Sequence, residues 1–333
     1  MARRRLTDRQ QERIESIQKR RRQQAERQTI ETVADRETQE GRVLTRHGKN
    51  LAVMSQDGVL HHCLTRQNIG EPVCGDRVVW QPTEPGQGVV TAILDRVSLL
   101  SRPTFNSTEK PLAANITQLV VVIAPEPNPS QYLLDQYLVA AELLRIRALI
   151  AVNKSDLLDS RGLAELDQGF GHYPAIGYPL LQISARFERG LAPLIRELRG
   201  QTTILVGQSG VGKSSLVNAL LPNIDILVGQ LSATSGLGTH TTSATTLYRL
   251  PQGGELIDSP GVRSFRLTRL DKAGLARGFK EFLPFVGRCR FSNCGHNHEP
   301  GCALIAAREQ GLVHPARFAN FLHMAQQLRG DRG

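Results

Sequence analysis

The sequence predicts a multidomain protein in which an N-terminal all-β barrel precedes a central α/β domain and a small α-helical C-terminal unit. Short alternating apolar runs, which are typical of antiparallel strands, fill residues 41–101. From Ile116 onward, strand-like apolar runs alternate with helical stretches, a pattern that indicates a parallel sheet covered by helices. After about Leu267 the pattern is helical around closely spaced cysteines, and 333 residues are enough for two or three packed units.

Composition narrows the class of protein. A hydrophobic content of 40% with 22% charged residues is ordinary for a soluble globular protein, and no apolar run approaches the roughly 20 residues that span a bilayer. No apolar stretch follows the basic residues Arg3, Arg4 and Arg5, so we expect neither a secretory signal nor a transit peptide. Five cysteines, an odd number, suit a reducing compartment. We therefore predict a cytoplasmic protein with no membrane partner.

Part of the net charge of +10 lies at the start of the chain. The first 30 residues hold ten Lys or Arg against four Asp or Glu. We interpret residues 1–40 as a basic flexible arm, because they contain few apolar residues. The excess positive charge favours a polyanionic partner, while a charge run that merely solvates the chain explains the arm alone equally well.

Residues 41–101 predict an OB-type barrel of five strands. Turn-forming stretches separate the strand-like runs, which read GRVLTR, LAVMS, VLHHCLT, DRVVWQ and GVVTAIL. Barrels of this type often bind oligonucleotides, and a barrel with a protein-binding or structural role is the alternative. Cys63 and Cys74 fall in this region and are expected to be ordinary thiols of the core or near the surface.

Residues 102–267 predict the α/β domain, and its most specific motif is a phosphate-binding loop. The string GQSGVGKS follows the strand-like run TTILV and precedes the helical run SSLVNALL, which is the context that this motif requires. Its glycines allow main-chain N–H groups to converge on phosphate oxygens at the start of a helix. Lys213 is expected to meet the β and γ phosphates, and Ser214 to bind Mg²⁺. The expected nucleotide contacts are Gly207, Gln208, Ser209, Gly210, Val211, Gly212, Lys213, Ser214 and Ser215.

A second motif selects the base. The string NKSD, which comprises Asn153, Lys154, Ser155 and Asp156, ends the run ALIAV and should lie at the carboxyl end of a parallel strand. Asp156 can accept hydrogen bonds from N1–H and the 2-amino group of guanine, whereas adenine would leave its carboxylate unpaired. Asn153 would brace the loop, and the Lys154 stem would pack on the base. Beside a phosphate loop, this motif predicts GTP and GDP as ligands and argues against an ATPase or a kinase.

The remaining elements of a GTP site are shorter. Ser184 and Ala185 follow the run LLQI and match the SA element that completes the guanine pocket in GTPases. Thr241 and Thr242, in the string GLGTHTTS, are candidate switch threonines, of which Thr242 would ligate Mg²⁺ and sense the γ phosphate. The string DSPG supplies Asp258, which would hold Mg²⁺ largely through water. Ser214, Thr242 and Asp258 are thus the expected magnesium residues.

The motifs occur in a rotated order along the chain. The base-reading elements precede the phosphate loop, whereas most GTPases begin with the phosphate loop. Such a circular permutation keeps all core contacts if the original termini lay together at the surface. The main-chain amide of Gly261 would contact the γ phosphate, and the segment after it leads into the C-terminal unit at residues 268–333. The nucleotide state could therefore be transmitted to that unit.

Hydrolysis is predicted to need an outside stimulus. Many GTPases carry a water-orienting Gln directly after the DxxG glycine, but this chain has Val262 there. Turnover should be slow until another group orients the attacking water, because positioning supplies most of phosphoryl-transfer catalysis. His240 is the first candidate, although a loop histidine is about as often a spectator or an RNA contact. Lys213 and Thr242 complete the expected catalytic set.

The C-terminal unit carries a predicted structural zinc site. Cys289, Cys294, His296 and Cys302 form the pattern C-x4-C-x-H-x5-C, which offers three thiolates and an imidazole to a tetrahedral ion. A small unit with few apolar residues needs such a staple, because its core is too small to be secure alone. His298 lies close enough to replace His296, and spacing does not decide between them.

These motifs together resemble the RsgA (YjeQ) family of ribosome-small-subunit-dependent GTPases. The resemblance covers about residues 41–330 and includes the barrel strings VCGDRVVW and LLSRP and the metal string CRFSNCGHNHEPGC. It implies that the protein binds the 30S subunit late in its maturation, contacts 16S rRNA near the decoding region, and hydrolyses GTP when the subunit stimulates it. It also favours His296 over His298 as the zinc ligand.

One alternative function stays open at this point. The chain could be a nucleotide-gated switch that binds another protein, without a direct RNA role and with its basic surface incidental. Partner binding that is insensitive to salt, and an absence of rRNA crosslinks, would favour that alternative. The sequence does not fix the oligomeric state, and a monomer is the expectation.

Overall fold

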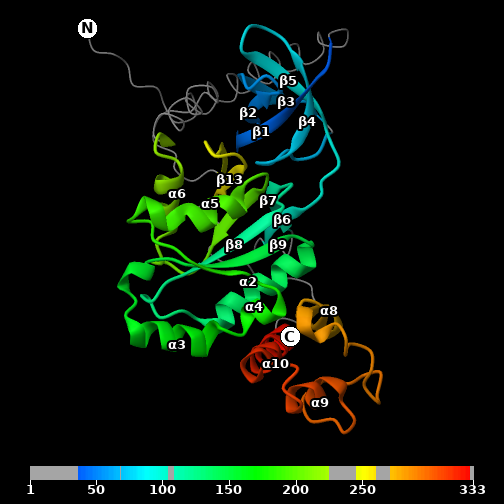
Figure 1. Cartoon of the computed structure of the whole chain (residues 1–333). Coiled ribbons are helices and arrows are strands. Elements are labelled where there is room, and N and C mark those ends of the chain that lie inside the picture. Colours follow the sequence, from blue (N-terminus) through cyan, green and yellow to red (C-terminus); the bar gives the residue numbers. More distant parts are fainter. Residues whose placement is uncertain (1–36, 68, 104–108, 225–244, 260–270, 331–333) are drawn as a thin grey trace, which may run out of the picture.

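Three units follow one another along the molecule (Figure 1). The computed structural model describes residues 37–67, 69–103, 109–224, 245–259 and 271–330. Figure 1 shows the barrel, in blue and cyan, at one end of the central domain and the orange and red C-terminal unit at the other. No helix within these ranges combines the length and the apolar character needed to cross a membrane. Residues 1–36 of the predicted arm lie outside them, and residues 39–40 belong to the first strand.

The barrel has the five strands that the sequence predicts. They are β1 (Gln39–His47), β2 (Asn50–Ser55), β3 (Leu60–Thr65), β4 (Arg77–Pro82) and β5 (Gln87–Ile93). Their order is β1-β2-β3-β5-β4, and β4 pairs back with β1, so the sheet closes on itself. Alternate side chains point inward, because successive residues of a strand face opposite sides. The resulting core is formed by Val43, Leu51, Val53, Cys63, Val78, Trp80 and Val90.

A bulge in β1 turns one face of the barrel toward the central domain. The register of β1 against β2 shifts between Val43 and Thr45, which leaves Leu44 outside the regular ladder. The outward-facing residues belong to the core of the central domain instead of the barrel core, and they include Leu44, Ala52 and Met54. The two units therefore share apolar packing as well as a chain connection.

The central domain is built on six strands, which follow the strand-like runs predicted from Ile116 onward. They are β8 (Gln118–Ile123), β9 (Arg147–Val152), β10 (Leu180–Gln182), β11 (Thr202–Val206), β12 (Thr246–Arg249) and β13 (Glu255–Asp258). Their order is β10-β9-β8-β11-β13-β12. The prediction of a parallel sheet is wrong for β12, which runs antiparallel to β13. The turn at residues 250–254 is too short for a parallel crossover, which needs a dozen or more residues.

Helices cover both faces of this sheet. They are α2 (Gln131–Leu144), α3 (Ser160–Phe170), α4 (Tyr173–Ile176), α5 (Ala192–Leu198) and α6 (Lys213–Leu220). Figure 1 shows α2, α3 and α4 on one side of the sheet and α5 and α6 on the other. The chain runs outward from β8 to β9 and β10 and then returns to place β11 on the other side of β8. Connections therefore diverge between β8 and β11, and ligands bind at the carboxyl ends of strands at such points.

Two features of the fold are absent from the sequence prediction. β12 pairs with β1 through Thr45 and Thr246, so the barrel and the central sheet form one continuous sheet. A hairpin of β6 (Leu99–Pro103) and β7 (Glu109–Ala114) forms a separate two-stranded sheet. This hairpin includes the run LLSRP, which the sequence analysis assigns largely to the barrel. The barrel and the central domain are therefore connected by strand pairing and by a hairpin, and not by a simple linker.

The C-terminal unit is helical, as predicted. It contains α8 (Lys272–Arg277), the 3₁₀ turn η3 (Lys280–Phe282), α9 (Ala303–Glu309) and α10 (Pro315–Gly330). Its core is aromatic, with ring centroids 4.8 to 6.3 Å apart among Phe279, Phe282, Phe318 and Phe321. Val139 of α2 belongs to the same apolar cluster, so the unit docks on that helix.

A buried arginine fixes this docking. The Arg317 guanidinium of α10 donates to the Asp135 carboxylate of α2 at 2.6 Å and to both Glu281 carboxylate oxygens at 2.7 and 2.9 Å. Both Arg317 and Asp135 have fully buried side chains. The face of the guanidinium lies 4.6 Å from the Phe279 ring centroid, and Asp135 also accepts from the Asn320 amide. The buried guanidinium is therefore paired with two carboxylates, that of Asp135 in α2 and that of Glu281 in η3.

We predict that Arg317→Ala destabilises the attachment of the C-terminal unit by about 3–5 kcal/mol, because it leaves the buried Asp135 carboxylate without its cation. A urea titration that follows the unfolding of the C-terminal unit measures this loss. Arg161→Ala is the matched control, since Arg161 forms an exposed pair with Glu165 and its removal should cost about 0.5 kcal/mol or less. Equal unfolding midpoints for the two variants would contradict the assignment.

Candidate functional site

The phosphate-binding loop lies at the carboxyl end of β11, where the sheet topology predicts a ligand. Gly207, Gly210 and Gly212 all have positive φ angles, of 139°, 86° and 92°. A Cβ at Gly207 would lie 2.1 Å from the carbonyl oxygen of Val122, and one at Gly212 would lie 2.4 Å from Asn153 Nδ2. Both glycines are thus required by close packing as well as by backbone conformation. The loop ends at Lys213, the first residue of α6.

Lys213 lies across this loop. Its Nζ donates to the carbonyl oxygens of Gly207 at 2.8 Å and Gln208 at 2.7 Å. Ser214 and Ser215 are exposed in the first turn of α6, and Ser209 and Gly210 are exposed at the tip of the loop. A cation, a helix N-terminus and three exposed serines therefore lie in or next to this loop, which is the chemistry that a phosphate chain with a bound cation requires.

Asn153 joins the base-reading loop to the phosphate loop. It follows β9, is 1% exposed, and its Nδ2 donates to the carbonyl oxygen of Val211 at 2.9 Å. Its Oδ1 accepts from the main-chain N–H of Ala185 at 3.1 Å. One side chain therefore holds together three of the predicted motifs. The sequence predicts that Asn153 braces its loop, and the structure identifies the two loops to which it is bonded.

Lys154 lies beside the same loop. It has a positive φ of 60°, and its Nζ donates to the carbonyl oxygen of Glu126 at 2.8 Å. Its Cε is 4.0 Å from the position that a Cβ on Gly212 would take. A left-handed conformation costs an ordinary residue about 1 kcal/mol or more, so the surrounding contacts must impose it. Ser155 follows in the 3₁₀ turn η1 (Ser155–Leu157).

The Asp156 carboxylate is exposed and oriented by its neighbour. The Ser184 hydroxyl donates to Asp156 Oδ1 at 2.5 Å, and Ser184 Oγ accepts from the main-chain N–H of Arg186 at 3.3 Å. Ser184 itself is 4% exposed. This contact leaves the outer side of the carboxylate open to solvent. The sequence assigns Ser184 to the base pocket from its position alone, whereas the structure shows that it holds the acidic residue.

Ser214 and Asp258 are the described members of the predicted magnesium shell, and Asp258 lies at the end of β13. Asp258 is exposed at the surface, yet partial desolvation by its neighbours raises the pKa of its carboxyl group, and the main-chain N–H of Ser259 partly opposes that shift. The next hydroxyl, Ser259 Oγ, lies 2.9 Å from Thr245 Oγ1. His240, Thr241, Thr242 and Gly261 lie outside the described residues, and so does Val262. Their predicted roles therefore stay predictions.

Helix α2 is a part of the site that the sequence analysis does not identify. Its first turns and the phosphate loop line a small hollow together, and the lining includes Leu133, Leu134 and Tyr137 of the helix and Gly207 and Gln208 of the loop. Burial raises the pKa of the Tyr137 phenol, and a main-chain hydrogen bond involving Gly207 opposes the rise. The loop therefore rests on the same helix that holds Arg317.

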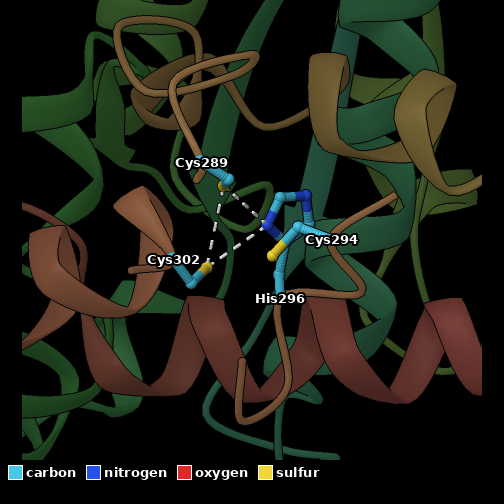
Figure 2. Close-up of side chains that lie close together, drawn as sticks. All are labelled: Cys289, Cys294, His296 and Cys302. Atoms are coloured by element: carbon cyan, nitrogen blue, oxygen red, sulfur yellow. Dashed lines mark hydrogen bonds between the residues drawn. The ribbon is translucent and has the colours of Figure 1, made fainter. Parts of the chain in front are cut away.

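The four predicted metal residues lie together in the C-terminal unit (Figure 2). The candidate ligand atoms of Cys289, Cys294, His296 and Cys302 all lie within 4.8 Å of one another. His296 Nδ1 lies 3.4 Å from Cys302 Sγ and 3.5 Å from Cys289 Sγ. Burial raises the pKa of Cys302 to about 12 and lowers that of His296, so a thiolate here needs a compensating cation. The group could hold a metal ion.

The loop around His296 is organised by an acidic residue that the sequence analysis does not single out. The Glu299 carboxylate accepts from the main-chain N–H groups of Asn297 at 2.8 Å, Gly295 at 2.7 Å and His298 at 3.1 Å. These bonds lower the pKa of Glu299 to about 2. They hold His296 in a left-handed conformation, with φ of 57°, that directs its ring to the thiols. His298 is exposed and is not part of the group.

Comparison with known proteins agrees with this arrangement. The sequence model of the family described as RsgA GTPase matches residues 93–268. A relative named small ribosomal subunit biogenesis GTPase RsgA, from Alcanivorax borkumensis, is 44% identical over 99% of this chain and 97% of its own length. The relative of the same name from Azotobacter vinelandii is 44% identical over 98% of both chains.

Solved structures show the same likeness. The crystal structure of YjeQ from Thermotoga maritima superposes with a TM-score of 0.74 at 31% identity, and it covers 88% of this chain and 99% of its own. The structure of YloQ, described as a circularly permuted GTPase, gives a TM-score of 0.72 at 28% identity over 89% of this chain and 96% of its own. The likeness therefore extends over all three units.

We predict that Asn153→Ala lowers the affinity for GDP about tenfold or more, because it leaves the Val211 carbonyl and the Ala185 N–H without their buried partner. Calorimetric titration with GDP measures the change. Asn223→Ala is the control, since Asn223 is exposed after α6 and should bind GDP as the unaltered protein does. A folded Asn153→Ala protein with unchanged affinity would contradict the bridging role.

We also predict that Glu299→Ala lowers metal affinity about tenfold or more, because the loop that presents His296 loses three main-chain hydrogen bonds. The measurement is the metal retained per chain after dialysis against a graded series of a chelator. Glu309→Ala in the same unit is the control, since Glu309 forms only a partly exposed ion pair. Equal retention by the two variants would count against the role of Glu299.

Proposed function

The chain belongs to the RsgA family of GTPases, and from that premise we propose that it binds the 30S ribosomal subunit late in its maturation and hydrolyses GTP there. It is a GTP-hydrolysing enzyme and acts in biogenesis of the small ribosomal subunit. The relatives that match over nearly the whole chain carry that function in their names. The proposal adds the particle as the direct partner, 16S rRNA as the contacted surface, and stimulation of hydrolysis by the subunit.

One observation carries the nucleotide part of this proposal. The Asn153 side chain bonds to the phosphate loop and to the SA element at once. A single guanine nucleotide would place its base at Asp156, steadied by Ser184, and its phosphates at the loop that carries Lys213. Adenine would leave the Asp156 carboxylate unpaired, which supports guanine specificity.

The phosphate loop and the predicted magnesium residues support a role in binding and charge stabilisation. The Lys213 ammonium and the N–H groups at the start of α6 would bind the β and γ phosphates and stabilise charge that develops during transfer. Mg²⁺, bound with the nucleotide by Ser214, Thr242 and Asp258, would supply further compensating charge. Val262 cannot orient water, which supports slow intrinsic turnover. His240 is the proposed water-orienting residue.

We assign zinc to the metal centre of the C-terminal unit. Three thiols and one imidazole within 4.8 Å of one another match the ligand preference and the tetrahedral coordination of Zn²⁺. A complete set of four protein ligands indicates a structural ion. With the aromatic core, it would stabilise a unit of few residues.

Charge and architecture support an RNA-rich partner. A net charge of +10 and an OB-type barrel are both typical of proteins that bind nucleic acid. A nucleotide-gated switch that binds only protein is the competing proposal. We further propose that the protein is a cytoplasmic monomer, since the 30S particle is its partner and each set of site residues lies within one chain.

The test is the GTPase rate in the presence of 30S, 50S and 70S particles across a salt series. We expect stimulation by 30S particles, and a steep loss of that stimulation as salt rises, because rRNA phosphates release counterions on binding. His240→Ala measured in single turnover should lose most of the stimulation. A rate that 30S particles do not change would overturn the proposed function. Undiminished stimulation in His240→Ala would remove only that residue from the mechanism.

A further inference from the structure

The contact between the barrel and the central sheet lies beside the magnesium edge of the site. In the described part of the chain, one residue pair, Thr45 with Thr246, joins β1 to β12. Thr246 is in turn paired with Asp258 across the β12–β13 hairpin. A threonine of the barrel is therefore two strands away from a residue of the predicted magnesium shell. Thr45 is 3% exposed, so its hydroxyl is a buried polar group.

Hydroxyl groups connect these strands at their ends. Thr45 Oγ1 donates to the carbonyl oxygen of Thr245 at 3.2 Å. The Thr245 hydroxyl lies 2.9 Å from that of Ser259, the residue that follows Asp258. The chain of contacts runs from the barrel through Thr245 to Ser259 without a break. Because buried hydroxyls need partners, moving Thr245 relative to the barrel would cost a hydrogen bond.

A second contact of β1 shows which end of the hairpin depends on Thr45. Arg42 donates to the Glu255 carboxylate at 2.8 Å and to the Thr202 hydroxyl at 3.1 Å. Glu255 begins β13 and Thr202 begins β11, so this contact fixes the ends of those strands that point away from the phosphate loop. Thr45 contacts the end of the hairpin next to Asp258 instead. Along β1, Arg42 therefore holds the strand ends that are far from the phosphate loop, while Thr45 contacts the end that is close to Asp258.

We propose that Thr45 is a positioning residue that couples the barrel to the magnesium edge of the nucleotide site through Thr245 and Ser259. A load on the barrel would shift β1, and the hydroxyl contacts would pass that shift to the residues beside Asp258. In the other direction, binding of nucleotide at the site would change how rigidly β1 is held. This inference rests on the proposed function for its biological role, since the partner that loads the barrel is the small subunit.

The test compares Thr45→Val with Thr45→Ser and Thr91→Val. Valine removes the hydroxyl at nearly constant volume, and serine restores it. Thr91 is the matched control, because its hydroxyl donates to the Val79 carbonyl at 3.2 Å entirely within the barrel. Hydrogen exchange in the peptide of residues 39–47 is measured with Mg²⁺–GDP and with a non-hydrolysable Mg²⁺–GTP analogue. The same proteins are then assayed for GTP hydrolysis with saturating 30S particles.

We expect slower exchange in this peptide with the GTP analogue than with GDP in the unaltered protein, in Thr45→Ser and in Thr91→Val. Thr45→Val should lose that difference. Its subunit-stimulated kcat should fall about two- to tenfold, the effect expected from loss of the bond to the Thr245 carbonyl, with the KM for GTP unchanged.

Two results would overturn the coupling, and a third bears on the proposed function alone. A nucleotide-dependent difference that persists in Thr45→Val would overturn it, as would no difference in the unaltered protein. If 30S particles do not stimulate even the unaltered protein, the proposed function fails. The exchange measurement, which needs no ribosomal particle, then still decides whether Thr45 couples the barrel to the site.

Discussion

The nucleotide site depends on one buried amide. Asn153 directly follows β9 and precedes the phosphate loop by more than fifty residues, and its side chain bonds to Val211 in that loop and to Ala185 in the SA element. Burial makes both bonds costly to lose, because each would leave a main-chain group without a partner. The two loops are far apart along the chain, and the Asn153 side chain helps to fix the distance between them. The close approach of Gly212 to Asn153 leaves no room for another side chain at that position.

The barrel and the C-terminal unit are attached to different parts of the nucleotide site. The barrel reaches the β12–β13 hairpin, which ends at Asp258, through Thr45 and the apolar residues beside it. The C-terminal unit is fixed to α2 by Arg317 and Asp135, and α2 also supports the phosphate loop. The permuted order predicts a single link from the switch region into the C-terminal unit. The structure adds an attachment through α2, which gives that unit a contact with the phosphate side of the site.

The sequence predicts strands and motifs well because their signals are local. All five barrel strands and six central strands have apolar runs, and residues 207–214 combine a glycine pattern with a strand before and a helix after. Contacts between distant segments are harder to predict. Nothing in the local pattern pairs Arg317 with Asp135 or Glu281, because these partners are 182 and 36 residues away in the chain. Glu299 is not recognised as the residue that organises the metal loop, because its role depends on the direction of main-chain N–H groups. The antiparallel direction of β12 could have been predicted, because the turn PQGG is too short for a parallel crossover.

The most direct test of the account is the structure of the protein with Mg²⁺ and GDP bound. The account predicts one nucleotide whose guanine N1–H and 2-amino group donate to the Asp156 carboxylate, while its β phosphate contacts Lys213 and the N–H groups of the loop. Asn153 should keep both of its bonds in that complex. A nucleotide bound through its phosphates alone, with its base away from Asp156, would contradict the claim that the two loops form one guanine-specific site.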